Sequence, residues 1–137
     1  MNIFELKFGD VYEDKISGFK GFAIAFGDSI TLTKRVCLMG KGNSYERITG
    51  TFFDWCRLDK LDSKNDLSLL ESSIGLSINL FDIVNYKLND FKGVVVARTR
   101  RVDGFHHVLV QPQCHDIGEY KQPEWIEASL CQVTGSL

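Results

Sequence analysis

An internal repeat is the feature that most constrains this chain, because residues 8–40 align without a gap on residues 80–112 after a shift of 72 positions. Seven of the 33 aligned positions are identical, and many others keep their apolar character. The identical pairs are Asp10/Asp82, Lys15/Lys87, Phe19/Phe91, Lys20/Lys92, Gly21/Gly93, Ala25/Ala97 and Val36/Val108. The same shift predicts the equivalences Phe53/Trp125, Leu58/Leu130 and Leu61/Val133 farther along the chain. We therefore expect a duplicated unit of about 55 residues, and the two units together make either one pseudo-twofold domain or two small barrels.

Each repeat has the alternating pattern of β-strands. In the first copy, Phe22, Ile24 and Phe26 alternate with small alanines. In the second copy, residues 93–97 are continuously apolar, which indicates a strand covered on both faces. Turn-forming residues such as Ser17-Gly18 separate these runs and tolerate positive φ. The predicted core residues are Phe19, Phe22, Ile24, Phe91, Val94 and Val96.

The segment between the repeats has a helical pattern instead. Leu67, Leu70 and Ile74 recur at helical spacing, and Ser63 is suited to cap the first turn. We expect a helix over about residues 66–74, with its apolar stripe packed between the two repeats.

The stretch VYEDKISGFKGFAIAF, which begins at Val11, resembles a KOW element, a short segment of small SH3-like barrels in ribosomal and transcription-elongation proteins. The shared features are a polar lead, a β-branched residue before Ser17-Gly18, and Gly21 at the start of an alternating strand, where it permits close backbone approach. The pattern DKISGFKG, with the later Gln111-Pro112, Trp125 and Leu130, is also similar to short proteins of tailed bacteriophages.

This resemblance implies a mainly β fold of two tandem small SH3-like antiparallel barrels joined by a short helical linker. The first repeat is expected at residues 1–62, the linker at 63–79 and the second repeat at 80–137. It also implies a non-enzymatic protein of viral origin.

Composition excludes several classes of function. Sixteen Lys and Arg against eighteen Asp and Glu give a net charge of -2, which argues against a dedicated duplex-DNA binder. The sequence shows neither a signal-peptide pattern nor an apolar run of the ~20 residues that span a bilayer. We therefore expect a protein of the host cytoplasm or the virion, without membrane contact. The widely spaced cysteines are expected to be reduced and buried: Cys37, Cys56, Cys114 and Cys131.

The motif search predicts no enzyme, no cofactor and no metal site. Residues 40–44 lack the spacing of a phosphate-binding loop and indicate a hairpin tip. The neighbouring His106 and His107 point to opposite faces of a strand, so only one of them could join a metal site with Cys114 and His115. Asp54 corresponds to Ile126 at the same shift, which favours an exposed strand end over a catalytic acid.

A basic cluster, Arg98-Thr99-Arg100-Arg101, distinguishes the second repeat, since the first has Phe26-Gly27-Asp28-Ser29 at the equivalent places. Alternation puts Arg98 and Arg100 on one face of the strand. One interpretation is a solvated strand end balanced by nearby acids. The other is an anion-binding patch, because guanidinium groups suit phosphates and carboxylates. The residues of that patch would be Arg98, Arg100, Arg101, Lys92, Phe105 and His107.

Three functions follow from these patterns. The leading hypothesis is a non-catalytic binding or assembly protein that engages a protein partner from the phage or its host. The alternative is an anion-binding protein that uses the basic cluster to hold RNA or a phosphorylated nucleotide. A small hydrolase is the third, and the motifs do not support it. Whether the chain forms homo-oligomers stays open at this point.

Overall fold

The computed structural model describes residues 3, 6–40, 50–64, 67, 77–88 and 91–137. Within these ranges the chain is mainly β, as predicted, and every strand pair is antiparallel. No helix in the described part of the chain is long and apolar enough to cross a membrane. The predicted helix at 66–74 lies outside the described residues apart from Leu67, and so does the predicted hairpin tip beyond Gly40.

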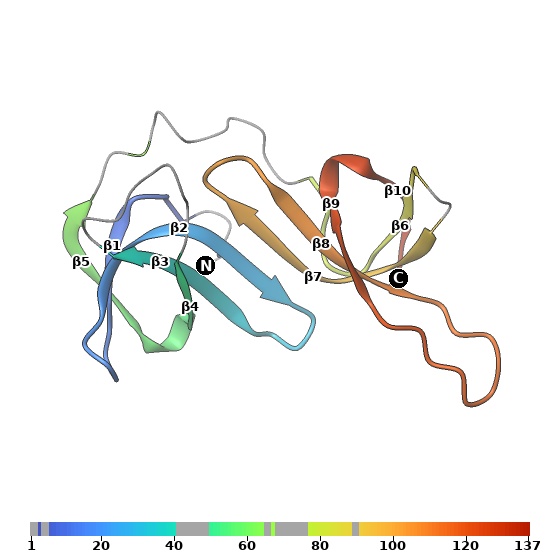
Figure 1. The fold of residues 1–137 in the computed structure, drawn as a ribbon, viewed down its shortest axis with the longest axis horizontal. Helices are drawn as coiled ribbons and strands as arrows, with labels where there is room; N and C mark the ends of the chain where they lie inside the picture. The colour runs from blue at the N-terminus through green and yellow to red at the C-terminus, as the bar shows by residue number, and fades with distance from the viewer. Residues whose placement is uncertain (1–2, 4–5, 41–49, 65–66, 68–76, 89–90) are drawn as a thin grey trace.

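The two halves of the chain have the same order of elements (Figure 1). The first half comprises β1 (Asp10–Asp14), β2 (Lys20–Ser29), β3 (Lys34–Gly40), β4 (Thr51–Asp54), the 3-10 turn η2 (Trp55–Arg57) and β5 (Leu58–Lys64). The second half comprises β6 (Asp82–Tyr86), β7 (Phe91–Arg101), β8 (His106–Pro112), β9 (Glu124–Glu127), η3 (Ala128–Leu130) and β10 (Cys131–Ser136). Because β5 extends through Ser63 to Lys64, Ser63 is a strand residue and not the predicted helix cap.

The long strands β2 and β7 bend at the same repeat position. The register shifts between Ala23 and Ala25 in β2, and between Val95 and Ala97 in β7. Glycines precede both bends: a Cβ on Gly21 would lie 2.7 Å from the carbonyl oxygen of Met39, and one on Gly93 would collide with that of Gln111. The predicted close backbone approach at Gly21 is confirmed, and the predicted turn places Gly18 at a φ of 78°.

After the loop that follows β3, the equivalence between the halves shifts from 72 to 73 residues. Ten residues separate β3 from β4, whereas eleven separate β8 from β9. Consequently Val36 pairs with Phe53, while its counterpart Val108 pairs with Ile126. The predicted pairs Phe53/Trp125, Leu58/Leu130 and Leu61/Val133 are therefore wrong by one residue; the structural pairs include Phe52/Trp125, Leu58/Cys131 and Asp54/Glu127.

The halves are joined by antiparallel pairing of β2 with β7. The central pair is Gly27 and Thr99, which are themselves 72 residues apart and thus equivalent in the repeat. Two flanking backbone hydrogen bonds are also equivalent: Ile30 N–H donates to Val96 O (2.9 Å), and Val102 N–H donates to Ile24 O (2.8 Å). A pseudo-twofold axis therefore passes between Gly27 and Thr99.

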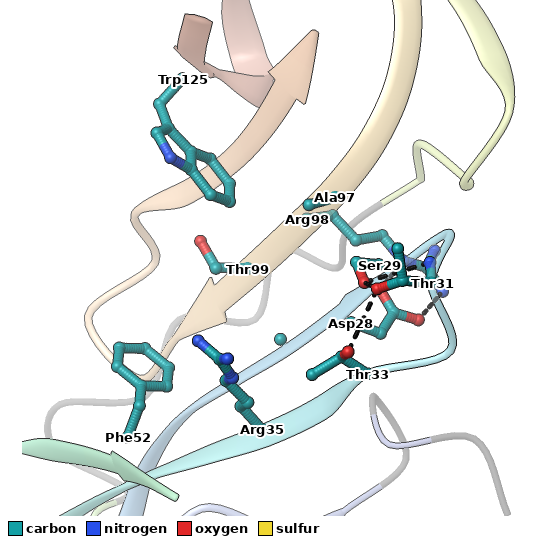
Figure 2. A pocket seen from close by; sticks show the side chains of 11 residues that line it. Asp28, Ser29, Thr31, Thr33, Arg35, Phe52, Ala97, Arg98, Thr99 and Trp125 are labelled. Atoms are coloured by element: carbon teal, nitrogen blue, oxygen red, sulfur yellow. Dashed lines mark hydrogen bonds and ion pairs between the residues drawn. The ribbon is translucent and has the colours of Figure 1, made fainter. Parts of the chain in front are cut away.

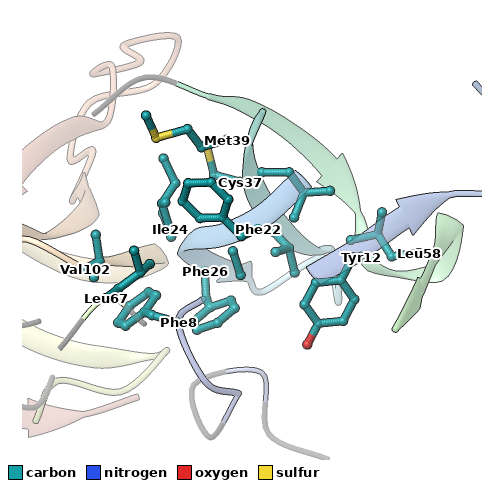
Figure 3. Packing of buried hydrophobic residues seen from close by; sticks show 14 of the residues in the cluster. Phe8, Tyr12, Phe22, Ile24, Phe26, Cys37, Met39, Leu58, Leu67 and Val102 are labelled. Carbon is teal, nitrogen blue, oxygen red and sulfur yellow. The ribbon is translucent and has the colours of Figure 1, made fainter. Parts of the chain in front are cut away.

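Among the described residues, two apolar clusters form the core, one in each half. The larger cluster surrounds Phe8 and Phe26, whose rings stack 4.8 Å apart, and includes Leu67 and Val102 from outside the first repeat (Figure 3). The smaller cluster contains Ile78, Val84, Val95, Val108, Val110 and Ile126. The added residues cover the first half more fully, so residues 21–27 are all buried.

Four of the six core predictions need correction. Phe22 and Ile24 are buried as predicted. Phe19 is 38% exposed and stacks on Phe53, because it lies at the turn before β2. Phe91, Val94 and Val96 are only half-buried. The buried residues of β7 are Gly93 and Val95, since this strand is covered on one face and not on both as predicted.

Candidate functional site

Arg98, the first residue of the predicted anion cluster, is occupied within the protein. Its Nε and Nη2 donate to the two carboxylate oxygens of Asp28, at 2.8 and 3.0 Å. Its Nη1 donates to the carbonyl oxygen of Ile78 (3.0 Å) and to Asn79 Oδ1 (3.2 Å). The side chains of Arg98 and Asp28 are only 12% and 11% exposed. Arg98 therefore links β7 to β2 instead of presenting its charge to solvent.

The other two arginines of the cluster also have intramolecular contacts. The guanidinium of Arg100 lies over the ring of Phe8, 4.9 Å from its centre. Arg101 donates from Nη2 to Asp103 (2.9 Å) in the turn that follows β7. Acids thus balance Arg98 and Arg101, as in the first interpretation, but Arg98 is largely buried and not solvated.

The six predicted anion-binding residues do not come together. Lys92 is exposed at the opposite end of β7, where it pairs with Asn85. Phe105 is 52% exposed in the turn between β7 and β8. His107 pairs with Thr99, on the face of β7 opposite to Arg98 and Arg100. Its neighbour His106 is buried beside Arg100, on the opposite face of β8, as the predicted alternation of the two histidines requires.

The pairing registers reveal a different site on the outer face of the joined sheet. One row of directly paired residues crosses six strands in the order Asp54, Arg35, Gly27, Thr99, His107 and Glu127. Paired residues share a face of an antiparallel sheet, so all six lie on one side, which we call the central face. The pseudo-twofold axis relates Asp54 to Glu127, Arg35 to His107 and Gly27 to Thr99.

Two further rows place an aromatic residue on each side of the axis. Phe52 is in line with Cys37 and Ala25, and Trp125 is in line with Leu109 and Ala97. These two aromatic side chains are 47% and 53% exposed, respectively. Because Phe52 and Trp125 are counterparts in the repeat, each half places one exposed aromatic ring beside the pseudo-twofold axis.

Phe52 and Trp125 line one hollow of about 320 Å³, together with Arg35, Thr99 and Gly27. Figure 2 shows the side chains of Trp125, Thr99, Arg35 and Phe52 on the same side of β2 and β7. Ser29, Thr31 and Thr33, which are hydrogen-bonded through their hydroxyl groups, also line the hollow, as do Ala97 and the bonded pair of Arg98 and Asp28. A hollow of this size is within the range of ligand-binding clefts.

Charge on the central face is arranged with bases inside and acids outside. Arg35 Nε donates to Asp54 Oδ1 at 3.2 Å, and this pair is well exposed, at 59% and 52%. In the second half, His107 occupies the place of Arg35, and its backbone partner in the register of β8 and β9 is Glu127. Asp54 is thus an exposed strand-end residue, as predicted, but its counterpart is the acidic Glu127 and not Ile126.

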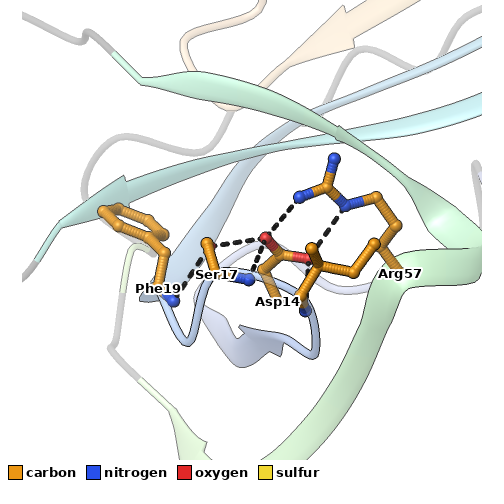
Figure 4. A network of polar contacts seen from close by, with 5 residues as sticks. Asp14, Ser17, Phe19 and Arg57 are labelled. Carbon is orange, nitrogen blue, oxygen red and sulfur yellow. Dashed lines mark hydrogen bonds and ion pairs between the residues drawn. The ribbon is translucent and has the colours of Figure 1, made fainter.

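A second polar cluster, around Asp14, has a structural role. The buried carboxylate accepts hydrogen bonds from Arg57 Nε (2.9 Å) and Nη2 (2.6 Å), and from Ser17 and Ile16 in the following turn (Figure 4). The hydrogen bonds from Arg57 are the main reason that the pKa of Asp14 lies well below its usual range. This network fixes the turn after β1 against η2, and keeps Asp14 ionised near neutral pH.

The cysteines depart from the expectation of four buried thiols. Cys37 is buried, which raises its pKa to about 11, but Cys56 and Cys114 are exposed and Cys131 is half-buried. All four are free of disulfide bonds. Within the described ranges, no group of three or more His, Cys, Asp or Glu is arranged to hold a metal ion.

Comparison with protein families, with curated proteins and with solved structures gives no match. The evidence for a site is therefore the geometry of this chain. Sequence reasoning missed the central face because it concentrated on the basic cluster and aligned Trp125 with Phe53. The correct signal was the pair Phe52/Trp125, which appears only when the longer second loop is allowed for.

Proposed function

We propose that this protein is a non-catalytic binding protein of phage type, built from two tandem SH3-like barrels, which engages a protein partner on the central face. The observation that carries the proposal is the hollow on the pseudo-twofold axis, with the exposed rings of Phe52 and Trp125 on its walls and Arg35 between them. Tryptophan and arginine are enriched among the residues that dominate the binding energy of protein interfaces.

The contacts of the basic cluster also support a protein partner over the alternative of RNA or a nucleotide. Binding a phosphate at Arg98 would require breaking its bidentate bond with Asp28, at a largely buried position. A partner that packs on the exposed rings of the central face would not have to break this bond. The net charge of -2 also disfavours a polyanionic partner such as RNA.

The proposal can be tested by selecting a displayed library of random peptides against the full chain. Peptides selected on the wild-type protein should bind Trp125→Ala or Phe52→Ala about tenfold more weakly or worse, because each substitution removes an aromatic side chain from the interface. Phe105→Ala is the matched control, because Phe105 is an equally exposed aromatic residue outside the hollow. Peptides that bind all three variants as well as the wild type would refute the central face as the binding site.

A further inference from the structure

We infer that the hollow takes an extended acidic segment of the partner, with one carboxylate on the pseudo-twofold axis and an apolar side chain on each side. This inference rests on the proposed function and specifies the chemistry of its partner. The carboxylate would bind Arg35 in the hollow, with His107 on the same face but beside the lining residues, and the apolar side chains would pack on Phe52 and Trp125.

The charge pattern of the central face argues for a single negative group at its centre. Arg35 uses only Nε on Asp54 among its described contacts, so its two terminal amino groups remain available as donors. His107, its counterpart across the axis, is half-buried on the same face. A guanidinium group binds a carboxylate through parallel N–H donors, which gives both affinity and orientation.

The same pattern argues against a polyphosphate chain. Asp54 and Glu127 form the outer ends of the charged row, so a strand of phosphates crossing the face would pass over both carboxylates. A segment with one central acid and apolar neighbours meets the bases at the middle and avoids the acids at the rim. Complementary charge of this kind selects a partner more than it adds affinity.

Gly27 and Thr99, the pair on the pseudo-twofold axis, line the centre of the hollow. Gly27 has no side chain, and a Cβ there would already lie 3.3 Å from the carbonyl oxygen of Arg98 and from Thr99 Cγ2. The equivalent residue across the axis, Thr99, has a short side chain that offers a hydroxyl to a passing chain. The hollow therefore combines two aromatic rings with polar side chains and has small residues at its centre.

The test uses a series of short peptides, Leu-Gly(n)-Asp-Gly(n)-Leu with n from zero to two, and the same series with Asn in place of Asp. Binding is followed by the fluorescence of Trp125 in the full-length Trp55→Phe protein, in which the ring contact with Tyr12 is kept by phenylalanine. We expect at least one Asp peptide to bind about tenfold more tightly than its Asn analogue. Arg35→Gln should remove that difference, whereas Arg35→Lys should keep part of it.

The outcomes separate this inference from the function on which it rests. If Asp and Asn peptides bind equally and Trp125→Ala abolishes both, the binding face stands and the acidic specificity is refuted. If no peptide from this series or from the displayed library depends on Trp125 or Phe52, both fail. The acidic-peptide inference would also be overturned if a single-stranded oligo(dT) competed with the peptides for the hollow and its binding were lost in Trp125→Ala. Lys121→Gln, which removes an exposed charge outside the hollow, is the control for general electrostatics.

Discussion

Breaking the bond between Arg98 and Asp28 should reveal how strongly the two halves depend on each other. This pair joins β7 to β2 next to the pseudo-twofold axis, and both side chains are almost nine-tenths buried. The perturbations are Asp28→Ala, Arg98→Met and the double variant. Methionine is chosen because it retains an apolar stem like that of arginine while it removes the guanidinium group.

The contacts set the size of the effect. Removing one partner of a buried ion pair typically costs 3–5 kcal/mol, because the other charge stays buried without compensation. In Asp28→Ala, Arg98 retains its bonds to Ile78 O and Asn79 Oδ1, so we expect the lower end, about 3 kcal/mol. We expect the double variant to be less destabilised than the sum of the single variants by about 2 kcal/mol.

Urea unfolding followed by circular dichroism measures these free energies, provided that the slope with denaturant is unchanged. The control is the same pair of substitutions at Arg35 and Asp54, an exposed cross-strand pair in the first half. An exposed pair contributes about 0.2–1 kcal/mol, so its coupling should be clearly smaller. If the coupling between Arg98 and Asp28 is below about 0.5 kcal/mol, or equals that of the control, the pair does not clamp the halves together.

Three further predictions concern single sites. Burial, followed by the charge of Arg100, lowers the pKa of His106 below its usual 6.5. As the pH drops, the unfolded chain therefore takes up a proton at this histidine before the folded protein does, so the stability should fall below about pH 6.5. Urea titrations at several pH values measure this dependence, and His106→Gln should flatten it. Labelling with a thiol reagent at pH 8 should modify the exposed Cys56 and Cys114 rapidly and leave Cys37 unmodified until unfolding; fast reaction of Cys37 would contradict its raised pKa and burial. Gly93→Ala should destabilise the protein by about 1–3 kcal/mol, because the new Cβ collides with the carbonyl oxygen of Gln111; an unchanged urea midpoint would refute this close contact.

The local pattern of the sequence determined the strands and their repetition. Alternating apolar residues and turn-forming glycines are properties of a few consecutive residues, so they predicted β2 around Phe22 and Ile24, and the turn at Gly18. Gly21 was recognisable for the same reason, since a glycine at the start of an apolar strand indicates a close approach of the backbone. These features depend on the period of a strand and not on which strands meet.

Only the tertiary structure decided how the two repeats are combined. The sequence left Arg98 between a solvated strand end and an anion site, because its partner, Asp28, is 70 residues away and becomes its neighbour only through the pairing of β2 with β7. Val95 is buried, and not Val94, because β7 is covered on one face while the equivalent stretch of β2 is covered on both. The extra residue before β9 set Trp125 opposite Phe52 across the axis. Which strands pair at their edges, which segments cover a sheet and how a loop sets the register all depend on residues far apart in the sequence. The alternation of apolar residues within one strand carries no information about them.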